Sequence, residues 1–199
     1  MTRIIGGSAG GRRLRTPPGS ATRPTSDRVR EALFSALEAR VGTLSGLRFL
    51  DLYAGSGAIG LEARSRGAAA VTLVERDRRT ARLISENATA LGLGPVEVLA
   101  AGVETTLART PPAAYDVVFL DPPYPMPDDD VTAALTALVR HGWVAPEGMV
   151  VVERGTRGSD HAWPAGLEHQ GDKRYGESVL RYGRRSQGDS DEQHSREER

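Results

Sequence analysis

The chain of 199 residues contains no cysteine and a single lysine, Lys173, and aromatic residues make up only 5% of it. Without cysteine it can form neither a disulfide framework nor a thiolate metal site. It lacks an apolar run of eighteen residues, which excludes a transmembrane helix, and its first residues lack the apolar core of a signal peptide. With 39% hydrophobic residues, the sequence predicts a cytosolic globular protein with one core, no membrane segment and no metal.

The formal net charge is zero, but the charges are unevenly distributed along the chain. Residues 1–30 carry one acid, Asp27, and seven arginines: Arg3, Arg12, Arg13, Arg15, Arg23, Arg28 and Arg30. Because the chain uses arginine almost to the exclusion of lysine, arginine as a residue type carries little information. Its clustering at one end favours a polyanionic partner there, with ordinary surface arginines as the alternative.

Apolar segments of strand and helix type alternate through the middle of the chain. Strands are predicted at 47–53, 71–74, 96–99, 115–120 and 149–152, and helices from Ala58, at 78–91 and at 131–139. Ser26 is positioned to cap a further helix whose apolar face begins at Val29. This alternation predicts a parallel sheet covered on both faces. A hairpin of 3–5 with 13–15 precedes it, and an antiparallel pair near 167–168 and 178–182 closes it.

Asp121, Pro122, Pro123 and Tyr124 directly follow the apolar run 115–120. A carboxylate there can accept one N–H of a flat amino group. The Pro122 carbonyl can accept the other, because the proline pair fixes the backbone and removes competing donors. Tyr124 offers a face on which a ring can stack. Alone, the tetrapeptide is equally compatible with a proline-rich turn after a strand.

A glycine-rich turn, 54–60, joins the first predicted strand of the sheet to a helix. Glycine allows the backbone to turn sharply and a ligand to approach it. Glu75 ends the next strand, where a carboxylate can accept the hydroxyls of a ribose. The spacing of Gly55, Gly57 and Gly60 also fits a dinucleotide-binding fold. Two points disfavour NAD: Asp51 suits a cationic amino-acid group better than a pyrophosphate, and a dehydrogenase does not need the segment 121–124.

The glycine turn and Glu75 resemble the cofactor motifs of class I S-adenosylmethionine-dependent methyltransferases. Segment 121–124 resembles the catalytic motif of enzymes that methylate amino nitrogens on planar rings. Segments 3–7, 10–14, 23–34 and 175–178 are similar to the bacterial 16S ribosomal RNA guanine-N2 methyltransferases of the RsmD type. This resemblance covers residues 1–183, and its amino-terminal part is the specific one.

The resemblance implies an α/β, Rossmann-like fold with a mostly parallel seven-stranded sheet and helices on both faces. We expect a basic N-terminal hairpin extension (1–20) and a methyltransferase domain (21–183), and the polar composition without periodicity of 184–199 predicts a disordered tail. It also implies S-adenosylmethionine as the cofactor. The implied cofactor-binding residues are Asp51, Tyr53, Gly55, Ser56, Gly57, Glu75, Arg76, Gly102 and Val103.

Among these residues, Asp51, Gly55 and Gly57 are expected to line the methionine part of the cofactor, and Glu75 to hold its ribose. Many class I enzymes carry an Asp after the third strand, where it contacts the adenine amine. Gly102 occupies that place here, so backbone groups of Gly102 and Val103 are the candidates for this contact.

Methyl transfer from a sulfonium is an in-line displacement, and the guanine amine is a poor nucleophile because its lone pair is conjugated into the ring. Hydrogen bonds to Asp121 and to the Pro122 carbonyl favour a more tetrahedral nitrogen and aim its lone pair at the methyl group. Orientation effects lower barriers by about 7–11 kcal/mol at most. The proton can leave afterwards, with Asp121 as one acceptor, so neither a metal nor a covalent nucleophile is implied.

The target base must leave its stack to reach such a pocket. The resemblance implies 16S ribosomal RNA, or a partly assembled small subunit, as partner, and a monomer is expected. The candidate RNA-binding residues are Arg12, Arg13, Arg23, Thr25 and Arg28. Two alternatives stay open: a DNA amino-methyltransferase acting on adenine or cytosine, and a non-catalytic RNA-binding assembly factor.

Overall fold

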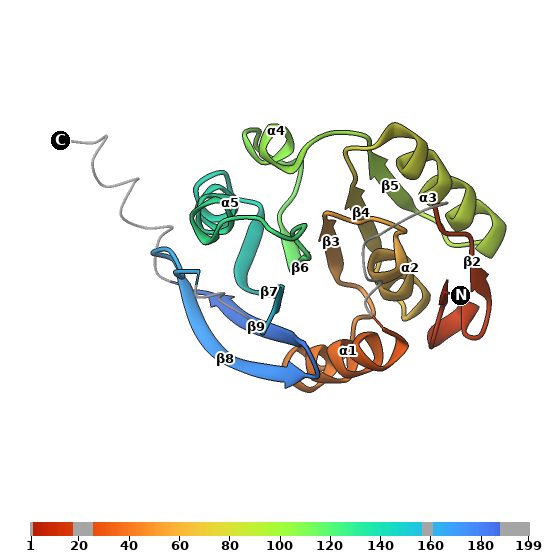
Figure 1. Ribbon diagram of the computed structural model, residues 1–199, viewed down its shortest axis with the longest axis horizontal. Coiled ribbons are helices and arrows are strands. Elements are labelled where there is room, and N and C mark those ends of the chain that lie inside the picture. Colours follow the sequence, from red (N-terminus) through yellow and green to blue (C-terminus); the bar gives the residue numbers. More distant parts are fainter. Residues whose placement is uncertain (1, 18–25, 157–160, 188–199) are drawn as a thin grey trace.

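The computed structural model of the protein describes residues 2–17, 26–156 and 161–187. A seven-stranded sheet forms its centre, with the order β5-β4-β3-β6-β7-β9-β8 (Figure 1). The strands from β5 to β7 are parallel to one another, whereas β9 is antiparallel to both β7 and β8. The strands are β3 (Arg48–Leu52), β4 (Ala70–Val74), β5 (Val96–Leu99), β6 (Tyr115–Leu120), β7 (Val144–Gly155), β8 (Leu167–Tyr175) and β9 (Ser178–Arg185).

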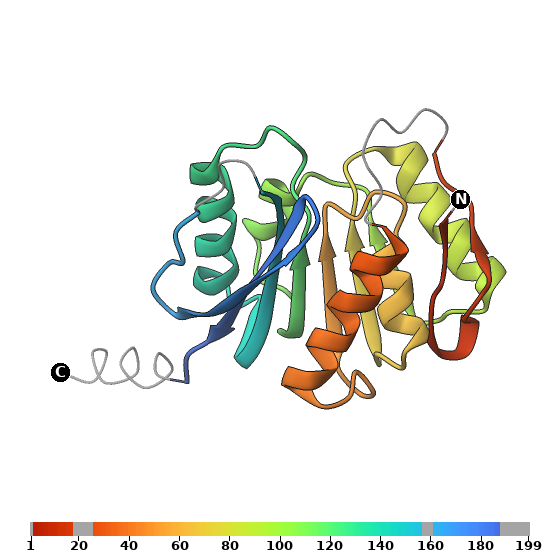
Figure 2. The same cartoon turned by 60° about the horizontal axis from the view of Figure 1, so that its bottom comes forward.

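Helices cover both faces of the sheet (Figures 1 and 2). One face packs on α1 (Asp27–Val41), α2 (Ala58–Ser65) and α3 (Arg78–Leu91), in a hydrophobic cluster that includes Leu33, Phe49 and Val151. The other face packs on α4 (Val103–Leu107) and α5 (Asp128–Arg140), in a second cluster with Leu50 and Val150. The predicted doubly covered, mostly parallel sheet is therefore confirmed. None of the helices in the described part of the chain is long and apolar enough to span a membrane.

The predicted elements agree with the structure to within a few residues, apart from β8, which runs to Tyr175 instead of ending near 168, and from three further differences. The Ser26 cap is confirmed, because its hydroxyl accepts a hydrogen bond from the Val29 N–H at 3.3 Å. The first difference is α4, whose five residues are too short to show a helical period. The second is β7, which begins at Val144 and passes through an irregular segment before the expected 149–152. The third is β9, which continues to Arg185, past the expected domain end at 183.

The expected N-terminal hairpin forms as β1 (Thr2–Arg3) and β2 (Arg13–Leu14), joined by a short 3-10 turn (Gly7–Ala9). It packs against α2 through a fully buried carboxylate, Glu62, which accepts the N–H groups of Ile5 and Gly6 at 2.6 and 2.8 Å. A side chain at Gly7 would lie within 1.9 Å of a backbone oxygen of α2. Since Ile4, Ala9 and Leu14 also join the main hydrophobic cluster, the hairpin is an integral part of the fold.

Candidate active site

The predicted site residues come together where the chain order of the strands reverses, between β3 and β6. From β3 the chain continues outward to β4 and β5, and it then returns to add β6 on the other side. Ligands of open α/β sheets bind at such a point, beyond the carboxyl ends of the strands. Leu52 of β3 pairs with Leu120 of β6, so the glycine turn and Asp121 begin at the same level.

The glycine turn uses the left-handed backbone that glycine allows, in agreement with the sharp turn that the sequence predicted. Gly55 and Gly57 have φ angles of 53° and 77°, and Tyr53 has a φ of 63°, which is unusual for a residue with a side chain. A Cβ at Gly57 would lie 2.8 Å from the side chain of Ile84, whereas one at Gly55 would meet nothing closer than 3.9 Å. The turn is therefore tightly packed at Gly57 and open at Gly55. A ligand could approach the backbone at Gly55.

Two carboxylates brace this turn from neighbouring strands. Asp51, which is 1% exposed, accepts the Gly60 N–H at 2.8 Å through one oxygen. Glu75 follows β4 and accepts the N–H groups of Gly55 and Asp77 at 2.9 and 2.8 Å, one on each oxygen. Each Glu75 oxygen has a further lone pair and could still accept a hydroxyl of a ligand. Arg76 and Ser56 lie beside these groups in the sequence, with Arg76 exposed and Ser56 half-buried.

Asp121 belongs to a row of three carboxylates on adjacent strands. Leu50, Leu52, Leu120 and Val152 all face α4 and α5, so the alternation of side chains turns Asp51, Asp121 and Glu153 to the opposite face. Burial raises the pKa of Asp51 to about 7, against a lowering by the Gly60 hydrogen bond and with a further rise from the Glu75 charge. Burial also raises the pKa of Asp121, and the charges of Glu153 and Asp51 add to it. Such a row of acids favours a cationic ligand.

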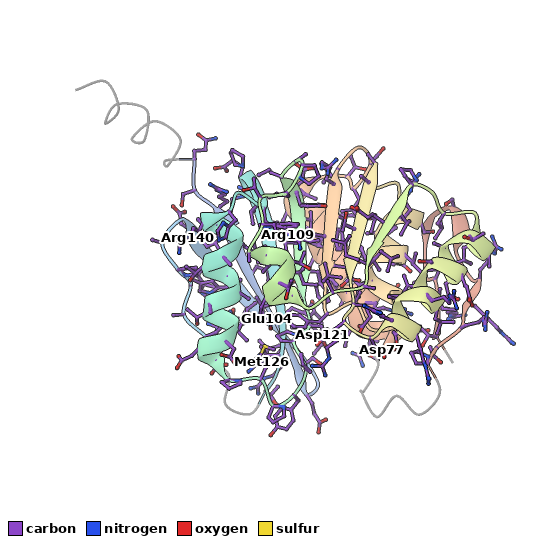
Figure 3. All side chains as sticks on the ribbon, turned by 90° about the horizontal axis from the view of Figure 1, so that it is seen from above. Asp77, Glu104, Arg109, Asp121, Met126 and Arg140 are labelled. Atoms are coloured by element: carbon purple, nitrogen blue, oxygen red, sulfur yellow. The ribbon has the colours of Figure 1, made fainter. Side chains whose placement is uncertain are left out.

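The segment after Asp121 forms a tight loop at the end of β6. Pro122 is buried, and the Met126 N–H donates to the Pro123 carbonyl at 2.8 Å. Tyr124 projects from this loop with 90% of its surface exposed, so its ring is available for stacking. Figure 3 shows Asp121 and Met126 at the end of the molecule away from Arg109 and Arg140.

The loop is held by Tyr53, which the sequence predicted as a cofactor contact, and by Arg154, which it did not single out. Arg154, from the end of β7, donates to the Met126 carbonyl at 2.7 Å and to Asp128 at 3.0 Å. The Tyr53 hydroxyl lies 3.7 Å from the Met126 sulfur, and burial raises the pKa of Tyr53 to about 12. Glu153 and Arg154 directly follow the apolar run 149–152, so a search for polar residues just beyond each parallel strand would have found both.

Gly102 and Val103, the candidates for the adenine contact, lie where β5 leads into α4. Gly102 precedes the first residue of the helix with a φ of −68°, and its carbonyl accepts from Thr106. Gly102 is half-buried and Val103 is buried. They lie after the strand next to β4, and Glu75 donates its N–H to the Leu99 carbonyl at 3.0 Å. The adenine contact itself stays a prediction.

The N-terminal arginines, which the sequence suggested as one RNA-binding cluster, differ in whether they contact the protein itself or are exposed. Arg12 donates to the Leu91 carbonyl at 2.9 Å and to the Ala90 carbonyl, so contact with RNA phosphates would require it to leave the end of α3. Arg30 is fully buried and donates to Asp27 and to the Arg3 carbonyl. Arg13 and Arg28 are exposed. Arg23 and Thr25 lie outside the described residues.

The chain matches the family model described as "Conserved hypothetical protein 95" over residues 2–184. It is 38% identical over 192 residues to "Ribosomal RNA small subunit methyltransferase D" of Escherichia coli strain K12, covering 95% of this chain and 93% of that protein. It is 34% identical over 154 residues to "Putative rRNA methyltransferase YlbH" of Bacillus subtilis, covering 76% of this chain and 81% of that one.

The fold resembles solved structures over nearly its whole length. The structure titled "Putative methyltransferase yhhF from Escherichia coli" superimposes with a TM-score of 0.82 at 33% identity, covering 93% of this chain and 98% of that chain. The putative methylase HI0767 of Haemophilus influenzae gives a TM-score of 0.75 at 29% identity, again over 93% and 98%. The family model, which matches residues 2–184, includes the amino-terminal hairpin as well as the central sheet.

Proposed function

Because the chain belongs to the Conserved hypothetical protein 95 family of RsmD-type ribosomal RNA methyltransferases, we propose that it methylates the exocyclic N2 amine of a guanine in 16S ribosomal RNA. The observation that carries this proposal is Asp121 at the end of β6, next to the glycine turn of β3. The substrate in the cell is the RNA within the small ribosomal subunit or its assembly intermediate. We further propose that the protein acts as a monomer in the cytoplasm.

The residues at this edge fit S-adenosylmethionine as the methyl donor. When bound, it supplies an electrophilic methyl group on a sulfonium cation. The row of Asp51, Asp121 and Glu153 favours a cation, because these buried carboxylates raise the energy of one another's charged forms. The open space above Gly55 leaves room for the methionine part, and Glu75 would accept the ribose hydroxyls. Tyr53, Ser56, Arg76, Gly102 and Val103 complete the proposed contacts.

Asp121 orients the guanine amine rather than acting as a strong base. Its carboxylate accepts one N–H and the Pro122 carbonyl accepts the other, which aims the nitrogen lone pair toward the methyl donor. Tyr124 stacks on the base after the base leaves its helix or loop. Arg13 and Arg28, both exposed, are the described N-terminal candidates for phosphate contacts, with Arg23 and Thr25 proposed on sequence alone.

The test is transfer of labelled methyl groups to small subunits isolated from cells that lack this protein, followed by mass mapping of the modified nucleoside. Naked 16S ribosomal RNA and duplex DNA serve as parallel substrates. Asp121→Asn should lower kcat roughly 100-fold, the usual loss for a preorganised polar contact, and spare cofactor binding. Asp129→Asn, at an exposed acid in the first turn of α5, is the matched control and should keep its activity. Label in DNA alone, or full activity of Asp121→Asn, would overturn the proposal.

A further inference from the structure

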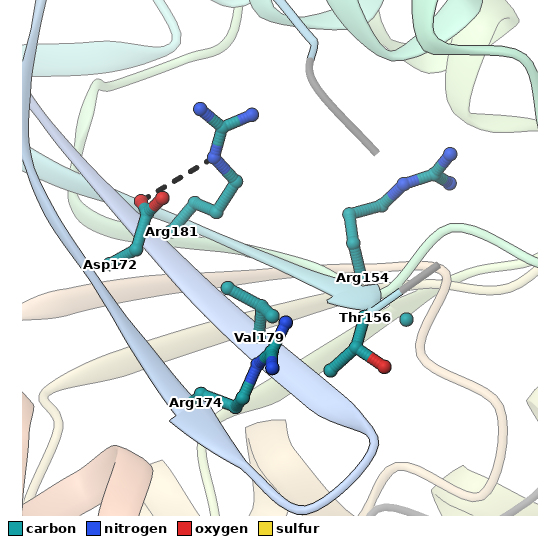
Figure 4. Close-up of a pocket in the computed structure, with 7 residues that line it drawn as sticks. Arg154, Thr156, Asp172, Arg174, Val179 and Arg181 are labelled. Atoms are coloured by element: carbon teal, nitrogen blue, oxygen red, sulfur yellow. Dashed lines mark hydrogen bonds and ion pairs between the residues drawn. The ribbon is translucent and has the colours of Figure 1, made fainter. Parts of the chain in front are cut away.

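A hollow of about 320 Å³ lies between the end of β7 and the β8–β9 hairpin (Figure 4). Three arginines line it, Arg154, Arg174 and Arg181, together with Thr156 and one acid, Asp172. The charged lining therefore carries more positive than negative charge, although the protein as a whole is neutral. The residues come from β7, β8, β9 and the bend after β7. Arg154 contacts the loop after β6, and Arg174 and Val179 flank the segment 175–178, which carries part of the family resemblance.

Strand register explains why the three guanidinium groups share one face of the sheet. Val179 of β9 is paired with Arg154 of β7 on one side and with Arg174 of β8 on the other. Arg154 and Arg174 therefore flank Val179, about two strand spacings or roughly 10 Å apart at the backbone. Arg181 lies two residues further along β9, on the same face as Val179. The three arginines thus surround the hollow, as Figure 4 shows.

Two of these arginines are fixed before any ligand arrives. Arg154 is held by the Met126 carbonyl and Asp128, and Arg181 by the His161 carbonyl at 3.1 Å and Asp172 at 3.4 Å. Guanidinium groups held in this way lose little conformational freedom when they bind an anion. Arg174 differs, because its side chain is exposed at the rim and can adjust to a ligand.

The hollow adjoins the proposed active site through Arg154. This residue follows Glu153 of the carboxylate row, and its guanidinium binds the loop that carries Tyr124. Given the proposed function, on which this inference depends, we propose that Arg154, Arg174 and Arg181 bind a backbone phosphate of the RNA strand next to the target guanine. Bidentate guanidinium groups suit phosphate oxygens, and the Thr156 hydroxyl adds a neutral donor. Such a contact fixes the register of the strand while the base enters the pocket.

The experiment compares Arg174→Ala with Arg109→Ala, which removes an exposed arginine at the opposite end of β6 (Figure 3). Steady-state methyl transfer to unmethylated small subunits is measured over a range of salt concentrations. Arg174→Ala should raise KM roughly tenfold, leave kcat within about twofold and reduce the slope of log KM against log salt by about one. Arg174→Lys, which keeps the charge, should recover most of the loss, and Arg109→Ala should behave like the unaltered protein.

Equal KM values and equal salt slopes for Arg174→Ala and Arg109→Ala would overturn the proposal. So would a lower melting temperature for Arg174→Ala that accounts for its loss of activity. Direct filter binding of 16S ribosomal RNA separates this inference from the proposed function. If the unaltered protein bound RNA without methylating it, the proposed function would fail, and the effect of Arg174→Ala on binding would still decide the phosphate site.

Discussion

The two arginine-rich regions of this protein both hold guanidinium groups against backbone carbonyls, but they differ in whether those groups surround a space that a ligand can enter. In the amino-terminal region, Arg12 and Arg30 donate to backbone carbonyls, and Arg15 pairs with Glu86 of α3. Around the β7–β9 hollow, Arg154, Arg174 and Arg181 lie on one face and surround a space that a ligand can enter. The first cluster is obvious in the sequence and is largely used to hold the fold together. The second is dispersed in the sequence and is assembled by strand register.

The comparison predicts that removing a contact of the amino-terminal region lowers the free energy of unfolding. We expect the largest effect at Glu62, the carboxylate of α2 that holds the hairpin. Glu62→Ala leaves the N–H groups of Ile5 and Gly6 and the Arg66 guanidinium without their shared buried carboxylate. Removing one partner of a buried ion pair costs about 3–5 kcal/mol. The free energy of unfolding, measured by urea titration, should fall by that order.

The control for this change is Glu38→Ala, which removes the more exposed carboxylate that also pairs with Arg66. An exposed pair of this kind contributes about 0–1 kcal/mol, so this variant should be almost as stable as the unaltered protein. Similar losses at Glu62 and Glu38 would mean that the hairpin is not anchored as the structure indicates. The amino-terminal region would then be free to act as an RNA-binding arm.

Local pattern explains what could be predicted from the sequence and what could not. The ends of β3, β4, β5 and β6, the Ser26 cap, the glycine turn and the position of Asp121 depend on neighbours within a few residues, and all were predictable. The partner of Ile5 is Glu62, 57 positions away, and no local pattern encodes that pairing. Likewise, Arg154, Arg174 and Arg181 share a face only because of the register of β7, β9 and β8.

For the same reason, charge clustering in the sequence was the weakest predictor of what the arginines contact. It states how many arginines a segment has, but not whether carbonyl groups of another element lie within their reach. The start of β7 was also missed, because the prediction rested on the apolar run 149–152, whereas β7 begins at Val144 and includes Glu147 at a positive φ of 61°.

A smaller effect, on stability alone, is expected at Arg12. Arg12→Ala removes two hydrogen bonds to carbonyls at the end of α3, where a cation also interacts favourably with the helix dipole. The loss should be about 1–2 kcal/mol in urea unfolding, with the salt dependence of RNA methylation unchanged. Arg13→Ala, at the exposed neighbour, should change stability by less than about 0.5 kcal/mol. If Arg12→Ala kept its stability and reduced the salt slope as Arg174→Ala is expected to do, Arg12 would bind RNA and would not serve to hold the fold together.

The finest test separates the carboxylate row from the arginine hollow, which lie on opposite sides of the sheet at the adjacent residues Glu153 and Arg154. Asp121 must be ionised to accept the amine, and its pKa is raised by burial and then by the charges of Glu153 and Asp51, while Arg154 lowers it. Activity should therefore fall as pH decreases through this raised pKa. Glu153→Gln removes one negative charge beside Asp121, which lowers the pKa of Asp121 and moves the acid limb of the kcat profile to lower pH.

The charges that act on the pKa of Asp121 are those of Glu153, Asp51 and Arg154, so Arg174→Ala should leave the acid limb of the kcat profile in place and change only the salt dependence. Glu153→Gln should do the reverse, shifting the acid limb while the salt slope and the plateau kcat stay within about twofold. A salt slope that changed in Glu153→Gln would show that the carboxylate row and the arginine hollow act as one electrostatic unit. An acid limb unmoved by Glu153→Gln would mean that Glu153 does not influence the ionisation of Asp121, and burial together with the charge of Asp51 would then have to explain its raised pKa.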